Sequence, residues 1–135
     1  MTLETHLRIA GALQIALAFL HVFLPRRFHW RDELARLSLL NRQIFLVHTL
    51  FVVVVIALIG AVSLFAPGAL MESTRLSRLV LSAFATFWGL RLAVQFLVYD
   101  SSLWRGQRFN TVMHALFSLL WAYLTGVYAA AALAG

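Results

Sequence analysis

Four long apolar runs, separated by short polar segments, dominate the chain. They cover about residues 7–24, 44–66, 79–99 and 111–133, and each is long enough to cross about 30 Å of hydrocarbon as a helix. The first two runs stop at Pro25 and Pro67, as helices do at proline. The valine-rich stretch 52–56 would favour a strand in water, but an open strand leaves its backbone unpaired in lipid. The pattern predicts an all-α integral membrane four-helix bundle with antiparallel up-down topology.

The segment between the first two runs has an amphipathic pattern of its own. Phe28, Trp30 and three leucines alternate with Arg31, Asp32, Glu33 and Arg36, which predicts a short interfacial helix lying among the lipid headgroups. Asp32 is the residue expected to cap its start. Trp30 and Trp104 are expected to anchor at one membrane surface. The first run lacks the preceding positive cluster and the cleavage site of a signal peptide, so we expect a mature helix there.

Composition supports the membrane class. Hydrophobic residues make up 62% of the chain and charged residues 12%, whereas soluble domains contain about 45–50% and about 25%. A soluble globular fold and a disordered chain are both excluded. The absence of cysteine excludes disulfides, iron–sulfur clusters and thiolate metal sites. All eleven cations are arginines that mostly flank apolar runs, so we expect no nucleic-acid partner despite the net charge of +6.

The arginines also predict an orientation. The two loops on one side carry Arg26, Arg27, Arg31, Arg36, Arg42, Arg105 and Arg108, and the side of the two termini carries Arg8, Arg75 and Arg78. Because cytoplasmic loops are enriched in arginine, both termini are expected on the non-cytoplasmic side of a bacterial-type inner membrane. Residues 1–135 are expected to form a single transmembrane domain.

The polar residues inside the runs concentrate in the cytoplasmic half. With antiparallel crossings, His21, His48, His114 and Arg91 lie roughly 6–12 Å below one surface. Polar positions recur on one face of each of the four runs: Gln14 with His21; Asn41 with His48; Arg91, Gln95 and Tyr99 with Trp88; and Asn110 and His114 with Ser118 and Trp121. The pattern predicts a polar pocket that opens towards the cytoplasm. The alternative interpretation is helix packing by polar contacts, with Arg91 reaching up to the surface.

Three kinds of chemistry fit this layer. In the first, His48 and His114 are the axial ligands of haem b, with His21 as the substitute, and Arg91 faces its propionates. In the second, His21, His48 and His114 bind a bare transition metal with one position left open. In the third, no cofactor is present: Arg91 and Tyr99 are catalytic, and Asn41, Gln95 and Asn110 help to hold a lipid, a small molecule or a quinone.

A non-catalytic role also fits the sequence. The chain is small, and Gly60, Gly89 and Gly126 allow close helix contacts, as expected for a homo-oligomer or for an accessory subunit of a larger membrane complex. Small four-helix membrane transferases share its size, but the chain carries no specific motif of theirs, so the likeness concerns architecture alone. The leading hypothesis is a membrane protein that binds a cofactor or small molecule, with haem- or metal-linked redox work first among its uses.

Overall fold

The computed structural model describes all 135 residues, and its regular structure is entirely helical. In chain order the elements are α1 (Leu3–Leu20), α2 (Leu24–Arg27), α3 (Trp30–Ala35), α4 (Leu39–Phe65), α5 (Pro67–Leu70), α6 (Arg75–Leu97), the 3-10 turn η1 (Ser101–Leu103) and α7 (Arg108–Ala134). Four of them, α1, α4, α6 and α7, are long and apolar enough to cross a membrane. They coincide with the four predicted runs, although each helix begins three to five residues earlier than predicted.

The chain divides into two compact units. Unit 1 comprises Met1–Leu7 and Pro67–Gly135, and unit 2 comprises Arg8–Ala66. Unit 1 therefore contains α6 and α7, whereas unit 2 contains most of α1 together with α4 and the connecting helices α2 and α3.

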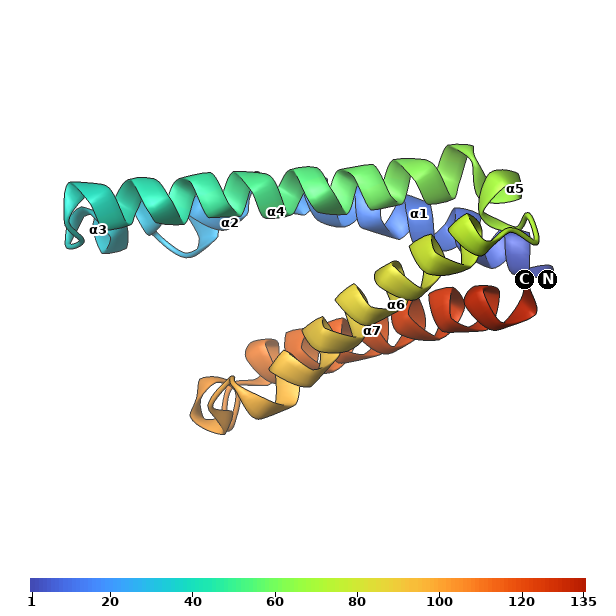
Figure 1. Cartoon of the computed structure of the whole chain (residues 1–135). Helices are drawn as coiled ribbons and strands as arrows, with labels where there is room; N and C mark the ends of the chain where they lie inside the picture. Colours follow the sequence, from blue (N-terminus) through green and yellow to red (C-terminus); the bar gives the residue numbers. More distant parts are fainter. The chain divides into compact units, whose positions relative to one another are not determined.

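In unit 1, α6 and α7 lie side by side (Figure 1) and are joined by aromatic pairs. Phe84 meets Tyr128 edge to face at 5.3 Å between ring centroids, and Trp88 stacks on Trp121 at 5.1 Å. From Phe84 to Trp88 the residue number rises along α6, whereas the residue number of the contacted ring falls along α7, from Tyr128 to Trp121. The Trp88 and Tyr128 side chains are almost completely buried, so these rings form the core of the pair.

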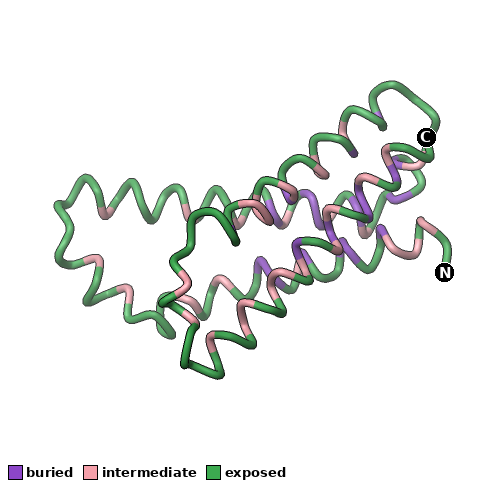
Figure 2. The backbone as a smooth tube through the Cα atoms, turned by 90° about the horizontal axis from the view of Figure 1, so that it is seen from below, coloured by how far each residue is buried: buried purple, intermediate pink, exposed green.

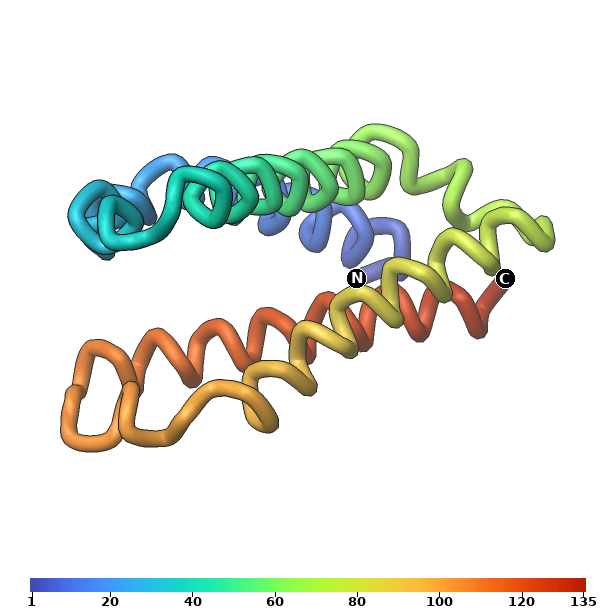
Figure 3. The backbone as a smooth tube through the Cα atoms, turned by 60° about the vertical axis from the view of Figure 1, so that its left-hand side comes forward, coloured from blue at the N-terminus to red at the C-terminus, as the bar shows by residue number.

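In unit 2, α1 and α4 approach closely through two glycines, and Figure 3 shows the two helices alongside one another. A Cβ atom on Gly11 would lie 2.6 Å from the backbone nitrogen of Leu64 and 2.7 Å from the carbonyl oxygen of Gly60. No side chain fits there, so glycine is required on α1 at this crossing. Next to it, Arg8 donates to the Leu64 carbonyl at 3.1 Å, which satisfies one of the last carbonyls of α4.

Side-chain caps fix several helix starts. Ser38 accepts the Asn41 backbone N–H at the start of α4, and Thr74 accepts the Ser77 N–H at the start of α6. The connector helix α3 begins differently from the prediction. Its N-cap is His29, in the left-handed region at φ 51°, and no side chain caps it. The expectation that Asp32 caps this helix is wrong, because Asp32 lies inside the first turn, where its charge still favours the positive end of the helix.

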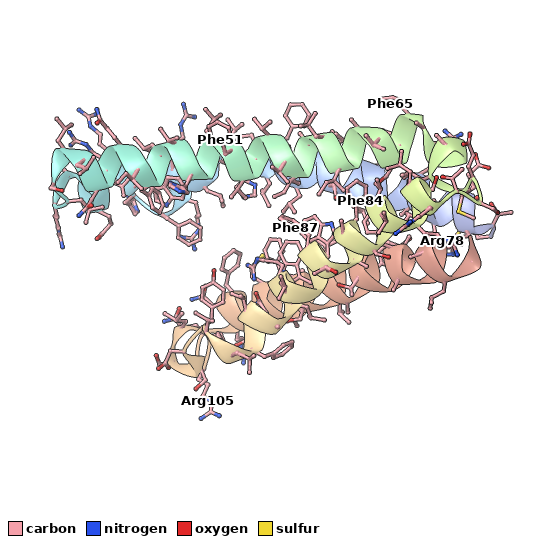
Figure 4. All side chains as sticks on the ribbon, in the orientation of Figure 1. Phe51, Phe65, Arg78, Phe84, Phe87 and Arg105 are labelled. Atoms are coloured by element: carbon pink, nitrogen blue, oxygen red, sulfur yellow. The ribbon has the colours of Figure 1, made fainter.

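Burial is uneven along the long helices (Figure 2). The buried residues of α4 are Ile56, Ile59, Gly60 and Ser63, all in its second half, and the five buried residues of α7 follow Leu120. Large apolar side chains elsewhere are exposed, among them Phe51 and Phe65, which both project from α4 in Figure 4. In a chain this apolar, exposed side chains of this kind fit contact with lipid.

Candidate functional site: a histidine pocket and an Arg–Gln–His chain

The first cluster is a pocket in unit 2 that contains two of the predicted histidines. His21 follows the last residue of α1, and His48 lies in the third turn of α4. The pocket has a volume of about 320 Å³, and its remaining wall is apolar apart from one hydroxyl; the lining residues are His21, Leu24, Trp30, Phe45, His48, Thr49 and Val52. Trp30 of α3 meets Phe45 of α4 edge to face at 4.9 Å between ring centroids. The connector helix therefore closes one side of this pocket with an aromatic ring.

Both histidines of the pocket are held in the same tautomer. The Nδ1 atom of His21 lies 2.8 Å from the Leu17 carbonyl oxygen, and that of His48 lies 2.8 Å from the Ile44 carbonyl oxygen. Because a carbonyl oxygen only accepts hydrogen bonds, each Nδ1 must carry the proton. The neutral rings therefore keep an unprotonated Nε2. An Nδ1–H bond to a backbone carbonyl is also the support that orients histidines bound to metals.

The second cluster is a chain of hydrogen bonds in unit 1. Arg91 of α6 donates from Nη1 to the Gln95 side-chain oxygen at 3.1 Å, and the Gln95 amide nitrogen lies 2.8 Å from Nδ1 of His114 on α7. Because a guanidinium only donates, it fixes the Gln95 oxygen towards Arg91 and the NH₂ group towards His114. The Nδ1 of His114 is therefore the acceptor, and the proton of the neutral ring is on Nε2. This tautomer is the opposite of that found for His21 and His48.

Aromatic rings surround this chain of hydrogen bonds. Trp104, from the loop before α7, stacks on the His114 ring with centroids 4.0 Å apart and planes at 11°. The Arg91 guanidinium carbon lies 4.8 Å from the Trp121 ring centroid and 5.6 Å from that of Tyr99. These rings supply cation–π contacts to the arginine, so its charge is partly stabilised without a carboxylate.

The loop that carries Trp104 is held by polar contacts of its own. Asn110 donates from Nδ2 to the Leu103 carbonyl oxygen at 2.9 Å, and Thr111 donates to the Trp104 carbonyl oxygen at 2.6 Å. Asp100 caps the turn η1, and the hydrogen bond from the Ser102 backbone N–H, with a further side-chain hydrogen bond from Ser102, lowers the pKa of its carboxyl below the ordinary value of 3.8. These hydrogen bonds therefore hold the loop that carries Trp104.

The predicted site residues fall into these two units. His21 and His48 share the unit 2 pocket, whereas Arg91, Gln95, Tyr99 and His114 gather in unit 1. The two asparagines have local roles: the Asn41 backbone N–H donates to the Ser38 cap, and the Asn110 side chain holds the loop described above. No group of three or more His, Asp or Glu side chains is arranged to hold a metal ion, so the three-histidine arrangement stays a prediction without structural support.

Two features near other helix ends were not predicted. His6, in the first turns of α1, lies 3.0 Å from the Tyr123 hydroxyl of α7 through its Nδ1 atom. A further pocket, of about 450 Å³, lies at the start of α7 and contains no member of either cluster; its lining residues are Gly106, Gln107, Arg108, Thr111 and Val112. His6 precedes the first predicted run, which starts at about residue 7, so it was not among the polar residues placed inside the predicted helices.

The aromatic walls of both clusters were also missed as site residues. The sequence suggests membrane anchoring for Trp30 and Trp104, yet one lines the histidine pocket and the other stacks on His114. Steps of four and three residues, through Ser118, placed Trp121 on the same stripe as His114, and this signal could have indicated its contact with Arg91.

No protein family, curated protein or solved structure matches this chain. Its function must therefore be argued from the chemistry of its own two clusters.

Proposed function

We propose that the chain is an integral membrane protein that binds a transition-metal centre through His21 and His48, either as a bare ion or as haem iron, for redox work. The observation that carries the proposal is the shared tautomer of these two rings in one pocket, with each Nδ1–H bonded to a carbonyl at 2.8 Å. Neutral imidazole with a basic Nε2 is a common ligand of iron, copper and zinc.

His114 is less suited to be the second metal ligand than its predicted depth in the membrane suggested. Its Nδ1 accepts from Gln95, so the lone pair that a metal would need at Nε2 is occupied by a proton. Ligation through His114 would require Gln95 to turn and to give up its bond from Arg91. His21 needs no such rearrangement, so it takes the place of His114 beside His48 in this proposal.

The haem form of the proposal has supporting charges in the same unit. The pocket wall includes Leu24 and Trp30, and Arg26, Arg27 and Arg31 lie on the same short segment of chain. Arginine suits the propionates of haem, which it binds through paired N–H groups. When bound, the iron would supply one-electron chemistry, and the protein would supply the two imidazoles, the apolar wall and these cations.

The membrane arrangement is part of the same proposal. The four long helices cross the bilayer as an antiparallel bundle, with α3 at the headgroups and both termini on the non-cytoplasmic side. The arginines of the connector and of the loop 98–107 then face the cytoplasm, and the histidine pocket lies in that leaflet. Cysteine reporters placed at Ser73 and Ser102 in intact cells test this orientation, because only the first should react with a membrane-impermeant reagent.

The experiment for the binding proposal is an optical spectrum with metal analysis of the protein purified in mild detergent. We expect either a Soret band or a transition metal near one equivalent, and we expect His21→Ala and His48→Ala each to remove it. His114→Ala should retain it. His29→Ala is the matched control, because His29 lies on the same connector but does not line the pocket.

The spectrum and the metal content distinguish the two proposed forms of the metal centre, haem iron and a bare ion. A Soret band identifies haem, and a bound metal without a Soret band identifies a bare ion. Retention of the metal in the His21→Ala and His48→Ala variants, or no bound metal after expression with iron and haem supplied, would refute the proposal. The role of accessory subunit would then be the better interpretation.

A further inference from the structure

The Arg91–Gln95–His114 chain presents mainly donors to a ligand. The Gln95 oxygen accepts from Arg91, and the His114 Nδ1 accepts from Gln95, so each acceptor already has a donor. The donors that remain are the other guanidinium N–H groups of Arg91, the second amide N–H of Gln95 and the Nε2–H of His114. A group that completes this site must therefore bring acceptors.

A third donor lies against the same arginine. The Trp121 indole N–H is buried without a hydrogen-bond partner, and the ring of this residue packs on the Arg91 guanidinium at 4.8 Å. An unpaired buried donor has lost its hydrogen bonds to water without replacement, and an external acceptor would restore one. Near it, the Ser118 hydroxyl donates to the His114 carbonyl oxygen at 2.7 Å.

Aromatic rings lie beside the donors of this cluster. Trp104 stacks on His114 at 4.0 Å, and Phe96 meets the other edge of the imidazole at 5.6 Å between centroids. Exposed apolar side chains continue away from the site along both helices, including Phe96 and Leu97 on α6 and Val112 and Leu116 on α7. A long apolar tail could lie along these side chains in the lipid.

We infer that this cluster binds a quinone, with one carbonyl oxygen accepting from His114 Nε2–H and the other from Arg91. A quinone has two acceptors, no donors, a flat ring and a lipid-soluble tail, so it matches each of these features. The His114 and Arg91 side chains are separated by one amide group, that of Gln95, and the two quinone carbonyls are separated by one six-membered ring. The inference does not depend on a metal at His21 and His48, because none of its residues lines that pocket.

The experiment is a titration of the full chain in phosphatidylcholine nanodiscs with a short-tailed ubiquinone analogue, followed by tryptophan fluorescence. Quinones quench tryptophan at contact, and Trp104 and Trp121 lie in the cluster whereas Trp30 does not. We expect saturable quenching whose amplitude falls in Trp104→Phe and stays in Trp30→Phe. His114→Phe keeps a ring to stack on Trp104 but removes the donor, and it should weaken binding at least tenfold.

Further variants distinguish a loss of quinone binding from a loss of folding, and quinone binding from metal binding. Arg91→Lys keeps the charge but loses the forked geometry, and it should also weaken binding at least tenfold while the thermal unfolding midpoint remains close to that of the wild type. His48→Ala should leave quinone binding unchanged. Laurate offers a single carboxylate in place of two carbonyls and should not compete.

Three outcomes would overturn the inference. These are quenching that never saturates, equal affinity of the His114→Phe variant and the wild type, and displacement of the quinone by laurate at similar concentrations. Displacement by laurate would indicate an anion site at Arg91. Loss of metal in the His48→Ala variant together with unchanged quinone binding would support both proposals separately.

Discussion

The contact between α1 and α4 allows a sharp test by single methyl groups. Gly11→Ala would place a Cβ atom 2.6 Å from the Leu64 backbone nitrogen and 2.7 Å from the Gly60 carbonyl oxygen. Both neighbours are backbone atoms, so the two helices must move apart. In Gly60→Ala the new Cβ atom would have its nearest contacts at 3.0 Å, so a smaller displacement suffices. Gly126→Ala on α7 meets nothing within 4 Å and serves as the matched control in a helix of similar composition.

The expected magnitudes follow from two opposing terms. Each substitution gains up to about 1 kcal/mol in helix propensity, and forced overpacking costs about 1–3 kcal/mol. Gly126→Ala should therefore be neutral or stabilising, whereas Gly11→Ala should lose about 1–3 kcal/mol relative to it, with Gly60→Ala between the two. The assay is reversible unfolding in detergent followed by circular dichroism, with equal unfolding slopes required for comparison.

A ranking that fails would refute the close approach of the two helices. If Gly11→Ala unfolds at the same midpoint as Gly126→Ala, then α1 and α4 do not meet at Gly11. If Gly60→Ala is the most damaging of the three, the crossing lies at a different register. A common loss in all three variants would show that helix–lipid effects dominate and that the contact contributes nothing specific.

Three further predictions test local features. Nitrogen-15 NMR of labelled histidine should show neutral His114 protonated at Nε2 and neutral His48 at Nδ1, and the same tautomer in both would contradict the hydrogen-bond pattern. The pKa of Asp100 is lowered chiefly by the Ser102 backbone N–H, so the cap should stabilise the loop above pH 3.8 and be lost as the pH falls through the folded-state pKa; a carboxyl carbon-13 titration midpoint at or above 3.8 would disprove this. Gly106 has φ +78°, so Gly106→Ala should destabilise the loop by about 1 kcal/mol in urea unfolding, and an unchanged midpoint would contradict the left-handed turn.

Hydropathy was sufficient to predict the four long helices because each must satisfy its backbone internally over a bilayer-sized length. The exact starts were less predictable, since α4 begins at a serine cap and α6 at a threonine cap, outside the apolar runs. The start of α3 could not be predicted from the polar residues, because its N-cap is His29. This residue begins the helix with a left-handed backbone conformation and not with a capping side chain.

The polar residues of the two clusters could be picked out from the sequence, but their aromatic neighbours and their grouping could not. The membrane depth predicted from the sequence indicated His21, His48, His114 and Arg91. Depth alone, however, does not determine which of these side chains lie in the same cluster. Which nitrogen of each imidazole carries its proton depends on one specific neighbour, such as Gln95 for His114 or a carbonyl four residues earlier for His48. Such neighbours depend on side-chain geometry, which the spacing of polar residues does not specify.

The unequal lengths of the long helices have a consequence for the bilayer itself. Helix α1 has 18 residues and spans about 27 Å, whereas α4 and α7 have 27 residues each and extend about 40 Å. If all four helices cross one bilayer, a single thickness cannot match all of them upright, and the longer helices would tilt or carry their ends into the headgroup region. Hydrophobic mismatch of this kind favours particular lipid chain lengths, and reconstitution across a series of acyl chains should show an optimum in stability for this protein.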